Sequence, residues 1–375
     1  MREELIELLS AAPGVTQRLR VLHFGQPGRG PKAVIQAALH ADEVPGMLVA
    51  QQLRHRLQAL EAAGQVLGEV RLLPCANPLG LTQHLLGQHQ GRFDLSDGLN
   101  FNRHLPDLGA AVAAAVGTQL GSDATANQVL VRQALRDAAT ALRAGTPAQD
   151  LKRRLVQQAT DADIVLDLHC DSQAVMHLYA LTPQADLAAE LGALLGARAI
   201  LLATESGDSP FDEACSRPWL HLQQQFPQAA VPLGCFSVTV ELRGEADTEH
   251  EQAARDADAL LEFLRRQGVL AADLVHAPAL LPVALCEPTP LAASEPITAP
   301  VAGVVVFRAE PGDFIEAGQV VADIVDADTG LVTPVAARSA GLLYARVSTR
   351  WAAPGKRLAK VAGTALTRTG KLLGS

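Results

Sequence analysis

Short apolar runs alternate with longer amphipathic stretches from about residue 20 to residue 265, and this alternation constrains the fold more than any other feature of the sequence. The buried central strands of parallel sheets are short, apolar and rich in branched residues. Four runs have these properties, namely Ala33 to Leu39, Val70 to Cys75, Ile164 to Leu168 and Ser237 to Leu242. The pattern predicts an α/β fold with a mostly parallel, mixed sheet flanked by helices.

Helical patterns fill the gaps between these runs. Met47 to Ala63 carries leucines at helical spacing, and Ala253 to Gln267 repeats the pattern as a closing helix. Between residues 107 and 162 we expect a helical insertion made of two helices, over 126–144 and 147–160. An insertion beside a site can act as a lid. It can equally be a structural or dimerising hairpin, and the sequence leaves both readings open.

The residue composition changes after residue 270. A proline-rich stretch comes first, and short valine-rich runs that indicate strands, separated by glycine, follow it. We therefore expect a catalytic domain over 1–270 and a small all-β accessory domain over 271–375. Ala299 to Val305 and Ala317 to Ala322 resemble the barrel-sandwich fold of biotinyl and lipoyl carrier domains. Those carriers present a modifiable lysine at a hairpin tip, but 322–340 contains no lysine. We expect a domain that covers or dimerises the catalytic one.

Composition excludes several partners. A net charge of -9, basic residues that never cluster and an aromatic content of 3% disfavour nucleic acid. The five cysteines are odd in number and lack CxxC spacing, which disfavours a disulfide framework and a cysteine-based zinc site. No apolar run reaches the roughly 18 to 20 residues needed to cross a bilayer, and nothing near Met1 resembles a signal peptide. We expect a cytoplasmic protein without a membrane or nucleic-acid partner.

His40 and Glu43 directly follow the first apolar run, within the segment Leu39 to Gly46. Zinc accepts neutral imidazole nitrogen and carboxylate oxygen, and a tight turn into a helix would aim both side chains at one point. The spacing alone is a weak signal. A surface turn with a solvated glutamate is the alternative.

A second histidine, His169, stands at the end of the run that begins at Ile164. In open α/β sheets, ligands bind outside the carboxyl ends of strands, so His40 and His169 could meet there. Cys170 should face the opposite way, because side chains alternate along a strand. A buried core histidine is the alternative for His169.

Glu241 ends another apolar run, Val238 to Val240, and would reach the same edge of the sheet. A carboxylate that does not bind the metal can take a proton from the attacking water. The alternative is an ordinary ion pair with Arg243.

Arg92, Asn102 and Arg103 lie in a predicted loop region. Guanidinium groups grip carboxylates through two parallel hydrogen bonds, and a second cation can stabilise an oxyanion. A solvated charge is the more ordinary role of an arginine in a loop.

Together these motifs resemble the succinylglutamate desuccinylase/aspartoacylase family, relatives of zinc carboxypeptidases. Four motifs occur here in the same order as in that family: His40 with Glu43, Asn102 with Arg103, Asp167-Leu168-His169 and Val240-Glu241. The resemblance covers about residues 20–265, and the β-rich part after it is also similar.

The resemblance implies one zinc ion per chain and a role for each residue. His40, Glu43 and His169 would bind the metal, and Glu241 would be the general base. Asn102 and Arg103 would clamp the substrate carboxylate, and Arg92 would polarise the carbonyl. The family's usual Asp-x-Asn-Arg reads Asn100-Phe101-Asn102-Arg103 here, so the Asn100 side-chain oxygen would replace a carboxylate that orients a histidine.

These expectations converge on a zinc-dependent amidohydrolase that removes a succinyl or acetyl group from a small N-acyl amino acid. Two alternatives stay open. One is a zinc carboxypeptidase that acts on short peptides, and the other is a non-catalytic binding or carrier module. The sequence also leaves a homo-oligomer open.

Overall fold

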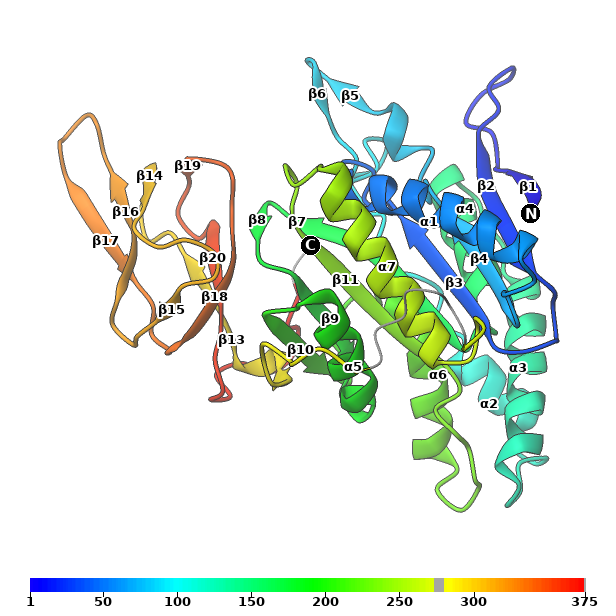
Figure 1. Cartoon of the computed structure of the whole chain (residues 1–375). Helices are drawn as coiled ribbons and strands as arrows, with labels where there is room; N and C mark the ends of the chain where they lie inside the picture. The colour runs from blue at the N-terminus through cyan, green and yellow to red at the C-terminus, as the bar shows by residue number, and fades with distance from the viewer. Residues whose placement is uncertain (273–279, 374–375) are drawn as a thin grey trace.

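The computed structural model describes residues 1–272 and 280–373, and within these ranges nine strands form one mixed sheet in the larger, helix-flanked part of the molecule (Figure 1). In spatial order the strands are β1 (Arg2–Glu7), β2 (Arg18–Gly25), β4 (Glu69–Leu73), β3 (Lys32–Ala37), β7 (Ile164–Asp171), β11 (Phe236–Gly244), β9 (His177–Leu181), β10 (Ala199–Ala203) and β12 (Thr289–Pro290). The four strands β4, β3, β7 and β11 run parallel. Their carboxyl ends therefore meet at one edge of the sheet.

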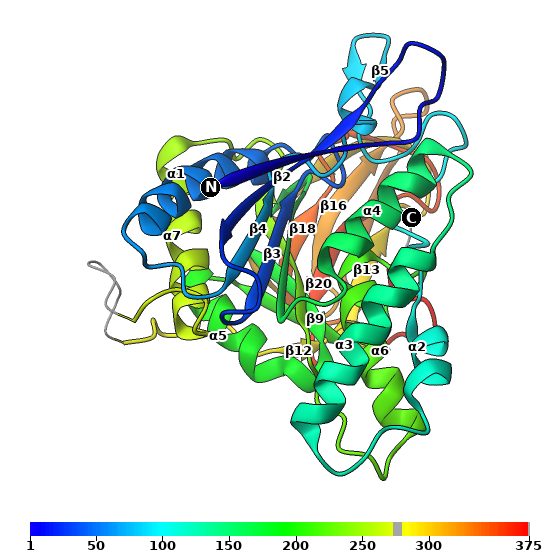
Figure 2. The same cartoon turned by 90° about the vertical axis from the view of Figure 1, so that its right-hand side faces the viewer.

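Helices cover both faces of this sheet (Figure 2). One face carries α1 (Pro45–Ala62), α5 (Ala185–Leu195) and α7 (His250–Arg266). The other carries α2 (Gly109–Val116), α3 (Ala124–Ala141), α4 (Pro147–Ala159) and α6 (Phe211–Gln225). Along β3, Ala33 and Ile35 pack into the first core and Val34 packs into the second. Both faces of the strand are buried, which explains why its sequence is apolar without interruption.

The expected central elements are present. The four predicted strands correspond to β3, β4, β7 and β11, and the predicted helices correspond to α1, α3, α4 and α7. The insertion holds a third helix, α2, which the sequence analysis did not predict. Its eight residues are almost all alanine and valine, so they show no amphipathic period that would indicate a helix.

Two further sheets lie beyond residue 290. The first contains β13 (Ser294–Thr298), β20 (Arg357–Ala362), β18 (Gly341–Arg346) and β15 (Phe314–Ile315), with β8 (Gln173–Ala174) paired to β18. The second contains β17 (Val332–Ala336), β16 (Val320–Val325), β14 (Gly303–Phe307) and β19 (Trp351–Ala352). All of their pairings are antiparallel, and apolar side chains from both sheets share one core. The predicted fold class is confirmed.

Backbone pairing links the large sheet to the segment after residue 270. β12 extends the large sheet beside β10, and β8 joins β18. The division into 1–270 and 271–375 stays a prediction. The remaining short elements are η1 (Gly80–Thr82), β5 (His84–Leu85), β6 (Gln88–His89), η2 (Thr182–Gln184) and η3 (Leu291–Ala293).

In the part of the chain that the structure describes, no helix combines the length and the apolar character that crossing a membrane requires.

Truncating a side chain in the central strand tests this architecture. Leu166 of β7 is fully buried, so Leu166→Ala should lower the free energy of unfolding by about 2–5 kcal/mol through lost burial and a residual cavity. Leu366→Ala, at a side chain that is 71% exposed, should change it by less than about 0.5 kcal/mol. Denaturant titration followed by circular dichroism measures both. Equal effects of the two substitutions would contradict the assigned core.

Candidate metal centre

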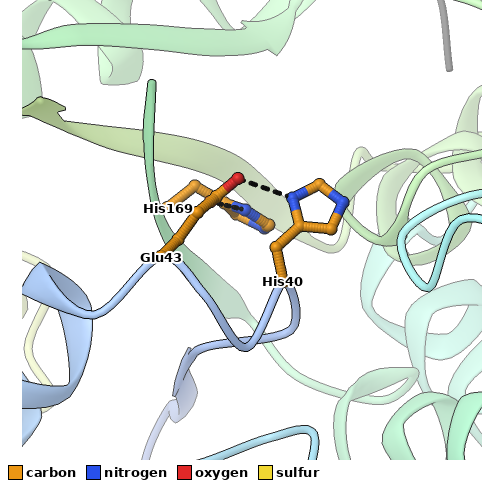
Figure 3. A group of neighbouring side chains, drawn as sticks. All are labelled: His40, Glu43 and His169. Carbon is orange, nitrogen blue, oxygen red and sulfur yellow. Dashed lines mark hydrogen bonds and ion pairs between the residues drawn. The ribbon is translucent and has the colours of Figure 1, made fainter. Parts of the chain in front are cut away.

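His40, Glu43 and His169 converge at the carboxyl edge of the sheet (Figure 3). His40 and Glu43 stand in the loop between β3 and α1, and His169 belongs to β7, the parallel neighbour of β3. One donor atom from each residue lies within 4.8 Å of the others, and all three residues are buried. The Glu43 carboxylate lies between the rings, with Oε1 2.8 Å from Nδ1 of His40 and Oε2 2.7 Å from Nδ1 of His169.

Contacts from two other loops hold the loop that carries His40. The Asn77 side-chain amide donates to the Leu39 carbonyl at 2.9 Å, and the Ala41 N–H donates to the Gly91 carbonyl at 2.9 Å. A Cβ atom at Gly91 would lie only 2.0 Å from the backbone nitrogen of Asp42, so glycine is needed for this close approach. The position of His40 is thus fixed by backbone packing as well as by its own side chain.

The outer ring nitrogens of both histidines face acceptors. Nε2 of His40 lies 2.8 Å from Oδ1 of Asn100, and that oxygen also accepts the backbone N–H of Asn102 at 2.8 Å. Nε2 of His169 lies 3.0 Å from Oδ2 of Asp167. Histidines that bind metals usually give their other ring N–H to such groups, which leaves the inner nitrogen free to bind the ion. Asn100 therefore stands where the sequence analysis expected it.

The three groups shift one another's pKa values. Burial lowers the pKa of His169, but the carboxylates of Asp167 and Glu43 outweigh burial and hold it well above its usual value. Burial raises the pKa of Glu43, but the two imidazoles hold it well below its usual value. Burial, followed by the Arg92 charge, lowers the pKa of His40, which favours the neutral ring that a metal ligand requires. A divalent cation would balance this buried carboxylate between two imidazoles.

Glu241 of β11 is paired in register with His169 on the neighbouring strand. Its Oε2 atom is buried and has no hydrogen-bond partner within the described ranges. Burial, and then the Glu43 carboxylate, raise the pKa of Glu241 to about 8. A carboxyl group that titrates close to neutral pH can accept a proton and return it. Arg243, the alternative partner that the sequence suggested, forms an ion pair with Asp256 instead.

Three further side chains surround this group. Nη1 of Arg92 lies 2.9 Å from Oε1 of Glu43 and 3.2 Å from Nδ1 of His40. Arg103 is buried and donates to the Asn102 carbonyl at 2.7 Å. The Asn102 amide oxygen accepts the N–H of Phe211 at the start of α6 at 2.8 Å, and its Nδ2 lies 3.3 Å from Nε2 of His169. Asn102 thus lies between α6 and His169, and its contact with a substrate stays a prediction.

A single cavity is lined by all seven residues singled out in the sequence: His40, Glu43, Arg92, Asn102, Arg103, His169 and Glu241. Segments that no motif indicated complete its wall, including Asp212 and Glu213 from α6 and Arg357 and Lys360 from β20. Lys360 forms an ion pair with Asp171, two residues beyond His169. Arg357 and Lys360 were not predicted, because they lie far from the motifs in the chain and their spacing indicates no site.

The helical insertion supports the cavity from outside. No side chain from residues 109–160 lines it. The buried Lys152 amine of α4 donates to the carbonyls of Asn100 at 3.1 Å and Arg103 at 2.7 Å. These contacts hold the loop that carries the expected clamp, which favours the structural reading of the insertion over the lid.

Comparison with known proteins gives one family. The model of the succinylglutamate desuccinylase/aspartoacylase catalytic domain matches residues 29–266. A solved structure of a protein of this family from Shewanella amazonensis SB2B is 26% identical, covers 96% of this chain and 98% of its own, and has a TM-score of 0.85. A second, from Shewanella frigidimarina NCIMB 400, is 24% identical with 96% and 97% covered and a TM-score of 0.85.

A solved structure with lower sequence identity has a similar fold. The product-bound ectoine utilization protein EutE (DoeB) from Ruegeria pomeroyi is 17% identical, with 97% of this chain and 95% of its own covered and a TM-score of 0.68. No curated protein matches the chain.

Substitution of Asn100 tests the role of its side-chain oxygen. Asn100→Ala removes the acceptor that faces His40 and should weaken metal binding, measured with added zinc, by about 10- to 100-fold, the usual effect of losing such a partner. Asn100→Asp keeps an acceptor oxygen at the same place and should bind zinc at least as tightly as the wild type. Competition with a chromophoric chelator measures both affinities. Equal affinity of the alanine variant and the wild type would show that Asn100 does not orient His40.

Proposed function

The chain belongs to the succinylglutamate desuccinylase/aspartoacylase family, a family of hydrolases, and we propose that it removes an acyl group, succinyl or acetyl, from an N-acyl amino acid in a zinc-dependent reaction. One observation carries the proposal. Two imidazoles and a carboxylate converge in a cavity that also holds an unpaired carboxyl oxygen of Glu241 within the described residues.

The donor set suits zinc. Two imidazole nitrogens and one carboxylate oxygen, from His40, His169 and Glu43, form the three-ligand set found in catalytic zinc sites. Zinc binding would displace the proton that the raised pKa of His169 favours. When bound, zinc supplies a Lewis acid that polarises a carbonyl and lowers the pKa of water. Asn100 and Asp167 keep the two rings oriented toward the ion.

Glu241 carries the proton in this proposal. The carboxylate accepts a proton from the water that attacks the amide carbonyl carbon. It then gives that proton to the leaving nitrogen as the carbon–nitrogen bond breaks, so that the products are a free carboxylate and an amino acid. The raised pKa of Glu241 brings its two protonation states close in free energy near neutral pH, which such a shuttle requires.

Arg92 and Arg103 would each interact with a negative charge of the substrate. Arg92 lies beside Glu43 at the cavity wall, where its guanidinium would stabilise the negative charge that develops on the carbonyl oxygen. Arg103 lines the same cavity and would hold the substrate carboxylate through its planar fork, with Asn102 beside it.

A substrate panel tests the reaction itself. Purified, zinc-loaded protein should release the free amino acid from at least one N-acetyl or N-succinyl amino acid, and a chelator should abolish that turnover until zinc is restored. Dipeptides with a free amino terminus form the contrast set. Turnover of the dipeptides alone would replace the proposal with a carboxypeptidase, and a protein that binds no zinc would remove it.

Replacement of Glu241 tests the proton carrier. Glu241→Gln keeps the shape of the side chain but cannot accept the proton, so kcat should fall by about 10²- to 10⁴-fold. Zinc content, measured by mass spectrometry, should stay at the wild-type level because Glu241 is outside the ligand set. Unchanged kcat in the zinc-loaded variant would assign the base to another group.

Replacement of Arg103 tests the clamp. Arg103→Lys keeps the charge but loses the bidentate fork, so KM should rise about tenfold, which corresponds to about 1.4 kcal/mol, with a smaller change in kcat. Steady-state kinetics on the best substrate of the panel provides the values. If KM stays at the wild-type value, another residue binds the carboxylate.

A further inference from the structure

The chain returns to the large sheet after its last strand, β20, and we call residues 363–373 the strap. Near its start, the N–H groups of Thr367 and Arg368 both donate to the Ala292 carbonyl of η3 at 3.1 Å. Near its end, the N–H groups of Leu372 and Leu373 donate to the Ser206 carbonyl at 2.8 and 3.0 Å. The strap is therefore bound at two places in the fold.

The loop 206–209 fits the strap closely. Lys371 forms an ion pair with Asp208, and this contact lowers the pKa of the Asp208 carboxyl group. Gly207 has a φ of +110°, and a Cβ atom there would lie 2.7 Å from Cγ of Lys371. A side chain at this position would collide with the strap and strain the backbone.

The same loop also contacts the segment that carries the expected clamp. The N–H of His104 donates to the Asp208 carbonyl at 2.6 Å, and the N–H of Leu105 donates to the Ser209 carbonyl at 3.1 Å. Both donors directly follow Arg103 in the chain. The loop 206–209 thus contacts both the strap and the segment that directly follows Arg103.

The two leucines at the end of the strap have different surroundings. Leu372 is buried in a cluster with Leu201, Leu291 and Tyr344, so its side chain fixes the strap between the large sheet and the sheet of β18. Leu373 is half-buried and lines the cavity that holds His40, Glu43, His169 and Glu241. Leu373 packs against the cluster that contains Leu201 and Leu291, and both of these residues also line the cavity.

We propose that the strap forms a wall of the reaction cavity and that Leu373 limits the size of the substrate group that fits against it. The inference rests on the proposed function, because it assigns a specificity-determining residue to that reaction. Backbone hydrogen bonds, the ion pair of Lys371 and the buried side chain of Leu372 hold Leu373 in place. Because a shift of Leu373 would break these contacts, its side chain can exclude larger substrate groups from the cavity.

The first arm of the test measures specificity with the full, zinc-loaded chain. Two substrate series are compared, one with acyl chains that lengthen from acetyl and one with amino-acid side chains that enlarge from alanine. Leu373→Ala should raise kcat/KM for the larger members relative to the smaller ones by about tenfold in at least one series, the usual effect of a few methylene groups in a pocket. Leu366→Ala, an exposed leucine of the same strap, should leave the preference unchanged.

The second arm measures docking without any turnover. Hydrogen exchange should find the amides of Leu372 and Leu373 protected in the wild type. Lys371→Ala, which removes a largely exposed ion pair, should speed their exchange by about two- to fivefold. Lys356→Ala is the matched control, because Lys356 lines the adjoining groove and forms no ion pair within the described residues.

The outcomes separate the two proposals. An active wild type whose preference is the same after Leu373→Ala overturns the role of Leu373, as does rapid exchange of the two amides in the wild type. A zinc-loaded wild type that hydrolyses neither series overturns the proposed function and with it the specificity role. Protection of the amides would then establish the strap as a structural contact alone.

Discussion

The Glu43 carboxylate lies between the His40 and His169 rings, and the strands and loops around it are arranged to hold these three side chains together. All three groups are buried, and a buried charge is tolerated only where partners compensate the lost hydration. The parallel pairing of β3 with β7 brings these residues together, since the loop after β3 and the end of β7 meet at one edge of the sheet. The central sheet therefore determines the geometry of the site.

Side chains that do not belong to the ligand set hold His40, Glu43 and His169 in place. Asp167 faces His169, and its other oxygen accepts a hydrogen bond from Gln36 at 2.9 Å. Lys152 of the insertion holds the loop that presents Asn100 to His40. Lys360 of β20 forms an ion pair with Asp171, the last residue of β7. Elements that contribute no metal ligand, such as α4 and β20, thus still help to position the residues of the site.

The sequence allowed much of the site to be predicted because its residues occupy recognisable places. His169 and Glu241 directly follow the apolar runs of β7 and β11, and His40 with Glu43 follows β3, so topology alone places them at one edge. The partners of these residues were harder to predict. Asp212, Arg357, Lys360 and Leu373 reach the cavity through packing between distant segments, and no local spacing indicates such contacts. The helix α2 was missed because a run of alanine and valine has no period.

X-ray absorption at the zinc edge of the purified protein identifies the metal ligands. We expect one zinc ion per chain with nitrogen and oxygen ligands only, two of them imidazoles, and loss of that signal after His169→Ala. A spectrum with a sulfur ligand, such as buried Cys170 would supply, would contradict a site made of His40, Glu43 and His169. So would zinc that stays bound with unchanged coordination in the variant.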